Sequence, residues 1–308
     1  MTEKPLVSVI INCFNGEKYL REAIDSVMAQ TYENWELVFW DNQSTDSTPV
    51  IISSYNDTRI KYYKAEEHTS LGEARNLAMR KATGQLCGFL DSDDIWGGDF
   101  LEECVFAFEN HHYTISAVYT NYLCFNSTKE HNASKREEGI VNFGDLLIGY
   151  DIGMSACVFR RELCAQKNIS FDKRFSLIED FDFFLTLAHI APIYYLETVL
   201  VKYRMHEDSL TVTHKKGWGK ELIILYDKLV ARGVDKQYPK QVQWIQVRAI
   251  NANINDCIEN NEKGKVWELI RDNWRKSWKL CFPVIFLLTG KSFYKRFYSS
   301  LRKKDYNA

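Results

Sequence analysis

The chain has 308 residues, of which 45% are hydrophobic and 26% are charged, and its formal net charge is -2. This composition is typical of a soluble globular protein with one large domain, or a domain plus an extension. The charge argues against general nucleic-acid binding, which needs a strongly basic surface. The longest apolar run is about half of the roughly 18 residues that span a bilayer, and residues 1–5 are too few and too polar for a signal peptide.

Charge is unevenly distributed along the chain. Residues 264–308 contain eleven Lys or Arg and three Asp or Glu, a local net of +8, so residues 1–263 carry -10. A basic tail on an acidic body indicates a surface that the tail alone contacts. The eight cysteines include no Cys-x-x-Cys pair and no zinc-like spacing, which suits a reducing compartment. We therefore expect a cytoplasmic protein.

Predicted strands and helices alternate in the first third of the chain. Apolar, largely β-branched or aromatic runs predict strands at 7–12, 35–40, 60–64 and 86–90. Helical spacing follows at 18–30, from the turn at 41–48 toward Tyr55, and at 71–82, where Gly84 is expected to end the helix. Such alternation predicts a parallel sheet with helices on both faces.

Polar clusters follow three of these strands. They are Asn12 to Asn15, Asp41 to Asp46 and Asp91 to Asp94. The carboxyl ends of parallel strands meet at one edge of a sheet, and ligands bind there. We therefore expect one binding site in preference to three unrelated turns.

The third cluster places three carboxylates, Asp91, Asp93 and Asp94, within four residues. Such close like charges repel one another, and a divalent cation such as Mg²⁺ or Mn²⁺ is the usual partner. Alternatively, Asp93 or Asp94 caps a helix that follows the strand. The spacing alone leaves both interpretations open.

The second half of the chain is less regular. Its pattern predicts a helix at 100–109, a strand at 115–125, a polar mobile loop at 126–139, a strand at 156–159, a helix at 181–189 and a strand-rich segment at 193–204. Further helices are predicted at 222–230, 242–258 and 266–279. We expect one domain over residues 1–212, with halves at about 1–98 and 99–212, and a helical extension over 213–308.

Several motifs, in this order, resemble those of family 2 glycosyltransferases. They are Val7 to Asn15, Asp41 to Thr48, Gly72 to Asn76, Leu90 to Asp94, Glu179-Asp180 and Tyr203 to His206. The resemblance covers about residues 5 to 212. It implies an α/β fold of the GT-A type with a mainly parallel central sheet. It also implies transfer of a sugar from a nucleoside diphosphate donor, with inversion at the anomeric carbon.

The resemblance also implies a set of residues that bind the nucleotide-sugar. They are Asn12, Phe14, Asn15, Asp41, Arg75, Asp91 and Ser92. Within this set, Asp41 is expected to accept a hydrogen bond from the base, and Asp91 to contact the ribose. Arg75 either contacts the donor or forms a structural ion pair with Asp91 or Asp94.

Two residues depart from the family's pattern. Asn42 stands where a second acid is usual, and Gln43 replaces the usual glycine. These changes put the identity of the base in doubt more than binding itself, and a UDP-sugar is the expected donor.

The diphosphate leaving group needs positive charge, which a bridging metal ion supplies. The resemblance implies Asp93 and His206 as ligands of Mn²⁺ or Mg²⁺, and an imidazole ligand favours Mn²⁺. Asp94 is left with the capping role.

The acceptor hydroxyl must lose its proton as it attacks, and a positioned carboxylate can accept that proton. The resemblance implies Asp180 as this base, with Glu179 as the alternative or as an orienting neighbour. A structural explanation also exists, because acids interact favourably with the N-terminus of a helix.

Aromatic and cationic residues alternate between residues 265 and 304. This pattern favours a helix that lies on an anionic membrane surface over a helical subdomain packed on the core, and over RNA binding. A peripheral position on the inner face of the cell membrane would suit a lipid-linked glycan acceptor in surface polysaccharide synthesis.

Two other functions compete with glycosyl transfer. One is a non-catalytic sugar-nucleotide or glycan-binding protein of the same fold. The other is a nucleotidyltransferase, but residues 13–17 lack the basic, glycine-rich phosphate loop that such enzymes use.

Overall fold

The computed structural model describes residues 4–111, 115–126, 128–207, 209, 217–276 and 283. The chain divides into two compact units between Ser209 and Leu210. The boundary expected at 212 lies outside the described residues. The first unit is mixed α/β and the second is helical.

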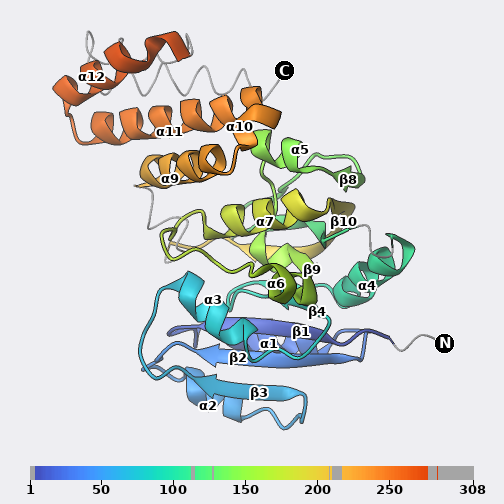
Figure 1. Ribbon diagram of the computed structural model, residues 1–308. Coiled ribbons are helices and arrows are strands. Elements are labelled where there is room, and N and C mark those ends of the chain that lie inside the picture. The colour runs from blue at the N-terminus through green and yellow to red at the C-terminus, as the bar shows by residue number, and fades with distance from the viewer. Residues whose placement is uncertain are drawn as a thin grey trace. The chain divides into compact units, whose positions relative to one another are not determined.

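A ten-stranded sheet organises the described part of the first unit, with the principal order β3-β2-β1-β4-β9-β6-β10-β5 (Figure 1). β7 pairs with β6, and β8 pairs with β10. The strands are β1 (Val7–Cys13), β2 (Trp35–Asp41), β3 (Ile60–Lys64), β4 (Leu86–Phe89), β5 (Ile95–Trp96), β6 (Ala117–Phe125), β7 (Glu130–Asn132), β8 (Gly139–Val141), β9 (Cys157–Arg160) and β10 (Ile193–Arg204). The first four are parallel to their neighbours among themselves, as predicted, whereas β9 lies antiparallel between β4 and β6.

Helices cover both faces of this sheet, because both faces of its central strands are apolar. α1 (Leu20–Met28), α2 (Thr48–Ser53) and α4 (Phe100–His111) share one core with alternate residues of β1 and β2. α3 (Leu71–Met79) and α7 (Glu179–Ile190) lie on the other face, where α7 contributes to a ring cluster of Phe89, Phe159, Phe171, Phe183 and Phe184. The remaining helices of this unit are α5 (Phe143–Ile148), η2 (Met154–Ala156) and α6 (Arg161–Lys167).

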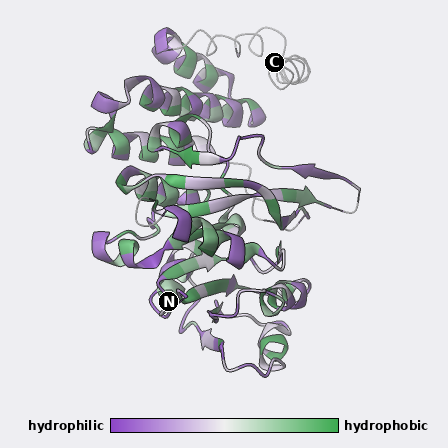
Figure 2. Cartoon of the chain, turned by 90° about the vertical axis from the view of Figure 1, so that its right-hand side faces the viewer, coloured by the Kyte–Doolittle hydropathy of each residue, from purple (hydrophilic) through white to green (hydrophobic). Residues whose placement is uncertain are grey.

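The second unit consists of α9 (Trp218–Ala231), α10 (Val234–Gln237), α11 (Pro239–Glu259), α12 (Lys263–Asn273) and η3 (Trp274–Lys276). In Figure 2 these helices alternate hydrophobic and hydrophilic residues, as amphipathic helices do. α9 approaches α11 closely, since a Cβ on Gly219 would lie 2.4 Å from Asn253 Oδ1. Within the described residues, no helix has the length and apolarity that crossing a membrane requires.

The role predicted for Gly84 is wrong. α3 already ends at Met79, five residues before this glycine. A Cβ on Gly84 would lie 2.5 Å from the Leu6 carbonyl oxygen and 2.8 Å from the Ser8 nitrogen. Because glycine has no side chain, the backbone at Gly84 can pack closely against β1 and the residue before it.

The segment at 126–139 also differs from the predicted mobile loop. Within its described residues, Glu130–Asn132 form β7, which pairs with β6. They also include Ser134 and Arg136, which make several hydrogen bonds. Alternation over only three residues is too short to reveal such a strand in the sequence.

Candidate active site

The acidic turn Asp91–Asp94 follows β4 at the carboxyl edge of the parallel strands, as predicted. Asp94 is 1% exposed, and it accepts hydrogen bonds from the Ser155 hydroxyl at 2.5 Å and from the Arg204 backbone N–H at 2.9 Å. Burial, together with Asp91 and Asp93, raises the pKa of Asp94 well above its usual range. Asp94 therefore fixes the turn to η2 and to the end of β10.

The predicted capping role of this turn is wrong. β5 follows the turn at Ile95, and α4 begins only at Phe100. The polar run after β4 thus leads into a short strand, because Ile95 and Trp96 pair with residues of β10.

Asp93 and His206 meet at this edge. The carboxylate Oδ2 of Asp93 lies 2.7 Å from the imidazole Nε2 of His206, and the side chains are 29% and 17% exposed. Oxygen and imidazole donors suit Mn²⁺, so the pair fits the expected metal. Within the described residues no three His, Cys, Asp or Glu side chains form a metal cluster.

Arg75 joins the acidic turn to α7. It is 3% exposed, and it donates to Glu179 Oε1 at 2.9 Å and to Asp91 Oδ1 at 3.1 Å. Its guanidinium also lies 5.7 and 5.6 Å from the ring centroids of Phe89 and Phe171. Burial lowers the pKa of Arg75, but the surrounding carboxylates more than offset this and raise it. Of the predicted ion pairs, the structure contains the one with Asp91 and not the one with Asp94.

Asp180 lies beside Glu179 in the first turn of α7. Its carboxylate accepts the Phe181 backbone N–H at 2.7 Å. Burial and the charge of Glu179 raise the pKa of Asp180 to about 7, against the lowering effects of Arg75, Phe181 and Tyr150. A general base works best with a pKa near the working pH, so Asp180 has the property that the predicted role requires.

The end of β1 carries polar and aromatic groups available to a ligand. Both carboxamide atoms of Asn12 are buried, and neither makes a hydrogen bond to the described residues, so the carboxamide can donate to and accept from a ligand. Phe14 is 51% exposed and packs on His68, with ring centroids 4.4 Å apart. The side chain of Asn15 instead accepts the Thr45 N–H at 2.8 Å and ties this loop to the next one.

Gly16 and Ser92 bring the first loop against the acidic turn. A Cβ on Gly16 would lie 2.5 Å from Cys13 Sγ and 3.2 Å from Ser92 Oγ. The glycine thus allows the first loop to reach Ser92 in the acidic turn.

Asp41, unlike Phe14, is buried. Its side chain is 0% exposed, and its two oxygens accept the Ser44 N–H and the Tyr62 hydroxyl, each at 2.7 Å. In this conformation Asp41 stabilises the turn after β2 through these two hydrogen bonds. The predicted contact with a base would require an oxygen to accept a further donor.

Of the two departures from the family pattern, the one at Asn42 has a structural reason. The carboxamide of Asn42 donates to the Thr69 carbonyl at 2.8 Å and accepts the Thr69 N–H at 3.1 Å. An aspartate could not make the donating half of this pair. Gln43 has φ of 73°, a left-handed conformation that glycine adopts more easily, and its amide donates to the Ala65 carbonyl.

Two residues with roles at the site were given none from the sequence. Arg204 donates from Nε to the Asp93 carbonyl and from Nη2 to Glu22 Oε2, each at 2.9 Å. Its place beside His206 in the Tyr203 to His206 motif could have indicated this role. Ser155 bonds to the acidic turn, but it lies in η2, whose three residues are too few to give a signal in the sequence.

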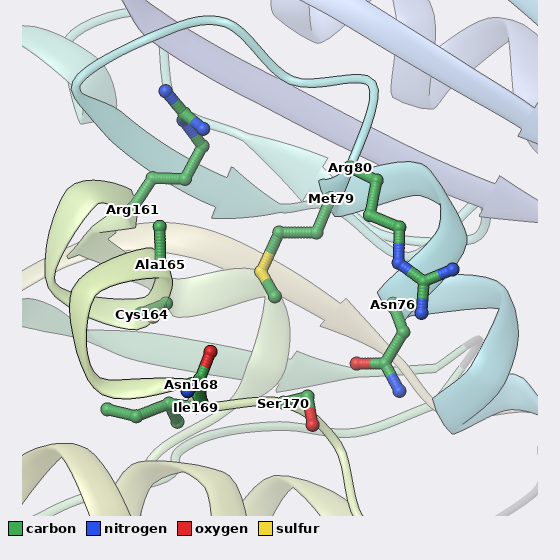
Figure 3. A pocket seen from close by; sticks show the side chains of 9 residues that line it. All are labelled: Asn76, Met79, Arg80, Arg161, Cys164, Ala165, Asn168, Ile169 and Ser170. Atoms are coloured by element: carbon green, nitrogen blue, oxygen red, sulfur yellow. The ribbon is translucent and has the colours of Figure 1, made fainter.

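A cavity of about 320 Å³ lies between α3 and α6 (Figure 3). Its lining residues are Asn76, Met79, Arg80, Arg161, Cys164, Ala165, Asn168, Ile169 and Ser170. Arg161 is already engaged with the carbonyl groups of Gly84 and Thr83. None of the lining residues belongs to the predicted site, so the cavity is distinct from the acidic edge.

Comparisons with known proteins identify the family of this chain. The family described as glycosyl transferase family 2 matches residues 8–166. The chain is 30% identical over 224 residues to WfgD of Escherichia coli, a UDP-Glc:alpha-D-GlcNAc-diphosphoundecaprenol beta-1,3-glucosyltransferase, covering 72% of this chain and 86% of WfgD.

Solved structures share the fold. S. aureus TarS 1-349 in complex with UDP-GlcNAc has a TM-score of 0.66 at 21% identity, covering 81% of this chain and 72% of that one. Two further structures of this TarS fragment are covered over 60% and 61% of their length. The mannosyltransferase PcManGT from Pyrobaculum calidifontis, in complex with GDP-Man and Mn²⁺, has a TM-score of 0.53 at 18% identity, covering 83% of this chain and 76% of that one. With its family match and its fold, this chain belongs to glycosyltransferase family 2.

Proposed function

We propose that this glycosyltransferase transfers a sugar from a UDP-sugar, with inversion, to a hydroxyl of a lipid-linked glycan in surface polysaccharide synthesis. The observation that carries the proposal is the bridge Asp91–Arg75–Glu179, which joins the donor edge to the helix that presents Asp180. WfgD, which acts on a lipid-linked sugar, supports the choice of acceptor. The UDP-GlcNAc complex of TarS supports the choice of donor.

The proposed reaction is a single displacement. The acceptor oxygen forms a bond to the anomeric carbon while the bond from that carbon to the phosphate oxygen breaks. The proton of the acceptor hydroxyl passes to the carboxylate of Asp180, and UDP leaves with the bonding electron pair. Attack on the face opposite the leaving group gives the inverted product.

The donor would lie along the edge formed by the ends of β1, β2 and β4. Phe14 offers an exposed ring for the base, and Asn12 offers a buried carboxamide without a partner among the described residues. Asp91, held by Arg75, would accept a ribose hydroxyl. Glu179 serves as the orienting neighbour of Asp180 through the same arginine.

Asp93 and His206 would hold the divalent metal, which when bound supplies positive charge for the diphosphate. PcManGT, a structural relative, was solved with Mn²⁺. We expect Asp93→Ala to weaken the Mn²⁺-dependent part of UDP binding by about tenfold or more, because one of the two protein ligands is lost. Calorimetric titration of UDP with and without Mn²⁺ measures this difference. Asp99→Ala, an exposed acid outside the turn, is the control, and equal Mn²⁺ dependence in both variants would exclude the ligand role.

The function is tested by incubating the protein with UDP-sugars and undecaprenyl-diphosphate-linked GlcNAc. We expect a glycosylated lipid and one UDP for each sugar transferred. Release of pyrophosphate would indicate a nucleotidyltransferase. Binding of the donor with neither product would indicate a non-catalytic binding protein.

We also propose that the C-terminal part contacts an anionic membrane. Trp267 and Trp274 are 51% and 50% exposed, and they lie among cationic residues of α12 and η3, Lys263, Lys265, Arg271, Arg275 and Lys276. Exposed tryptophan beside cations suits the membrane interface. The rest of the proposed segment up to 304, apart from residue 283, lies outside the described residues.

Replacing Trp267 and Trp274 by Ala should reduce the fraction that floats with anionic liposomes several-fold. The remaining binding should fall with added salt, because cations alone would carry it. Phe106→Ala removes an exposed ring from α4 and is the control. If the double variant and the control float equally, these tryptophans do not bind membrane.

A further inference from the structure

The aromatic ring of Tyr19 lies against two residues at the end of β10. Tyr19 is partly buried and directly precedes α1. Its ring centroid lies 5.2 Å from that of the His206 imidazole, with an interplanar angle of 52°. The guanidinium carbon of Arg204 lies 4.3 Å from the centroid of the same ring. One ring therefore contacts a predicted metal ligand, His206, and the arginine that ends β10.

Arg204 connects this ring to the other predicted ligand. Its Nε donates to the backbone carbonyl of Asp93, and its backbone N–H donates to the Asp94 carboxylate, each at 2.9 Å. Neither bond uses the Asp93 carboxylate, whose Oδ2 lies 2.7 Å from His206 Nε2. Arg204 thus fixes the backbone of the acidic turn and leaves the side chain of Asp93 for a role as ligand.

The guanidinium of Arg204 is itself held by aromatic rings and by one acid. It lies 4.3 Å from the centroid of Tyr19 and 4.8 Å from that of Phe125, and arginine stacks favourably on aromatic faces. Its Nη2 also donates to Glu22 at 2.9 Å, but the Glu22 side chain is 54% exposed, so solvent weakens this ion pair. We therefore expect the ring of Tyr19 to contribute much of the constraint on Arg204.

The backbone on both sides of His206 is held by hydrogen bonds. The Met205 N–H donates to the Phe125 carbonyl at 2.8 Å, and the Ser209 N–H donates to the His206 carbonyl at 3.2 Å. These bonds fix the main chain but leave the imidazole free to rotate about its side-chain bonds. Packing against the Tyr19 ring limits that rotation.

We propose that Tyr19 is a positioning residue for the divalent-metal site, orienting the His206 imidazole directly and Asp93 through Arg204. The inference rests on the metal site of the proposed function and deepens it by naming a residue that acts on both ligands. Groups around metal ligands that fix their orientation strengthen binding of the ion. Both contacts of Tyr19 are made by its ring, so the hydroxyl is not required.

The test is the affinity of the full chain for Mn²⁺ alone, measured by the proton relaxation enhancement of the bound ion. We expect Tyr19→Leu to raise the Kd of Mn²⁺ about 10- to 100-fold, the range found when groups that orient metal ligands are removed. UDP binding in EDTA and thermal stability in EDTA should match those of the unaltered protein, because both are measured without the ion. A general loss of structure would change these two quantities as well.

Two further variants separate the ring from other effects. Tyr19→Phe keeps the ring, so its Kd for Mn²⁺ should stay within about twofold of that of the unaltered protein. Tyr63→Leu is the matched control, because it removes a tyrosine ring of β3 that also lies near a cation, Lys81, at 5.3 Å. Equal Mn²⁺ affinity in Tyr19→Leu and Tyr63→Leu would overturn the proposal.

Arg204→Met tests the link between Tyr19 and Asp93. This change should also weaken Mn²⁺ binding, and its effect should be smaller in a chain that already carries Tyr19→Leu, because the two residues act through one guanidinium. Fully additive effects would contradict the link through Arg204. Failure of the unaltered protein to bind Mn²⁺ would reject the metal site and this inference with it. Mn²⁺ binding without sugar transfer would instead reject the proposed reaction and leave this inference in place.

Discussion

Asp180→Asn is expected to lower the rate of sugar transfer by about 10²- to 10⁴-fold, the range that a general base contributes. The amide has nearly the shape of the carboxylate but cannot accept the acceptor's proton. UDP binding should be unchanged, because Asp180 reaches the donor edge only through Arg75 and Glu179. Steady-state kinetics and calorimetric titration separate the two effects.

Glu179→Gln distinguishes the two carboxylates. Glu179 is 6% exposed and paired with Arg75, so this change should cost stability more than rate. If Asp180→Asn retains most of the transfer rate and Glu179→Gln does not, Glu179 is the base.

The raised pKa of Asp180 leads to two further predictions, one for the pH dependence of kcat/KM and one for the pH dependence of stability. With a pKa of about 7, the free enzyme loses the base form below neutrality, so kcat/KM should fall about tenfold per pH unit below 7.

The native pKa of Asp180 lies above the ordinary 3.8, so the native state holds this proton more tightly than the unfolded chain. That stabilisation is lost as pH rises from about 4 to 7. Asp180→Asn should therefore be more stable than the unaltered protein at pH 8, by up to about 4 kcal/mol, and denaturant unfolding at pH 5 and pH 8 measures it.

The regular elements that carry local signals were predicted well from the sequence. β3 and β10 have the predicted bounds, since each begins after a polar residue or proline and is rich in β-branched or aromatic residues. β5, β7 and β8 were missed, because strands of two or three residues have no periodicity of their own and exist through pairing with β6 and β10. The antiparallel insertion of β9 between β4 and β6 also depends on contacts far apart in the chain.

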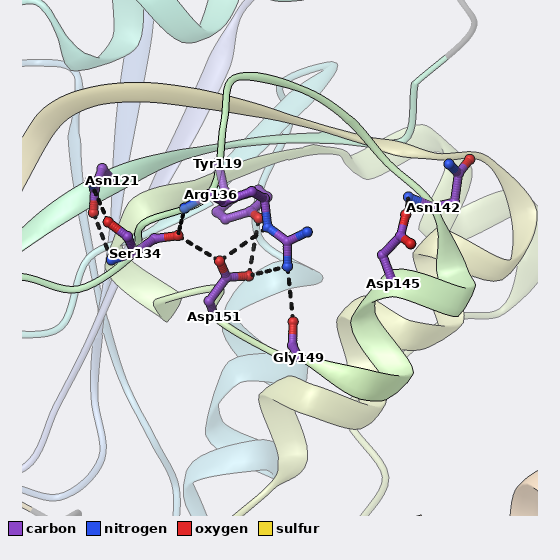
Figure 4. Close-up of polar contacts among 8 residues, drawn as sticks. All are labelled: Tyr119, Asn121, Ser134, Arg136, Asn142, Asp145, Gly149 and Asp151. Carbon is purple, nitrogen blue, oxygen red and sulfur yellow. Dashed lines mark hydrogen bonds and ion pairs between the residues drawn. The ribbon is translucent and has the colours of Figure 1, made fainter. Parts of the chain in front are cut away.

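The site could be predicted as a set of residues but not as a network. The motifs placed Asp93 and His206 at one edge, and the structure puts them 2.7 Å apart. The hydrogen-bond network around Asp151 had no such signal, because folding alone brings Arg136, Ser134 and Tyr119 to this carboxylate (Figure 4). Whether Asp41 can accept the predicted hydrogen bond from the nucleotide base depends on how exposed its carboxylate is. A sequence motif does not encode that exposure.

Arg75→Met is expected to cause the largest loss of stability at the site, about 3–5 kcal/mol near pH 8. Removing one partner of a buried ion pair leaves the other charge without compensation, and here two carboxylates, Asp91 and Glu179, share one guanidinium. Methionine fills similar volume, so packing against Phe89 and Phe171 is largely kept. Arg174→Met, which breaks an ion pair whose arginine side chain is 55% exposed, should cost less than about 1 kcal/mol.

The pH dependence of Arg75→Met separates its electrostatic effect from simple loss of packing. Burial raises the pKa of Asp91, and Arg75 opposes that rise; it also opposes the rise at Asp180. Without Arg75 both native pKa values should increase further, so the stability deficit should be largest at pH 8 and shrink as pH falls toward the ordinary value near 4. The acid limb of the remaining activity should move above pH 7 for the same reason. A stability deficit that is equal at pH 5 and pH 8, with an unmoved acid limb, would show that Arg75 acts through packing alone.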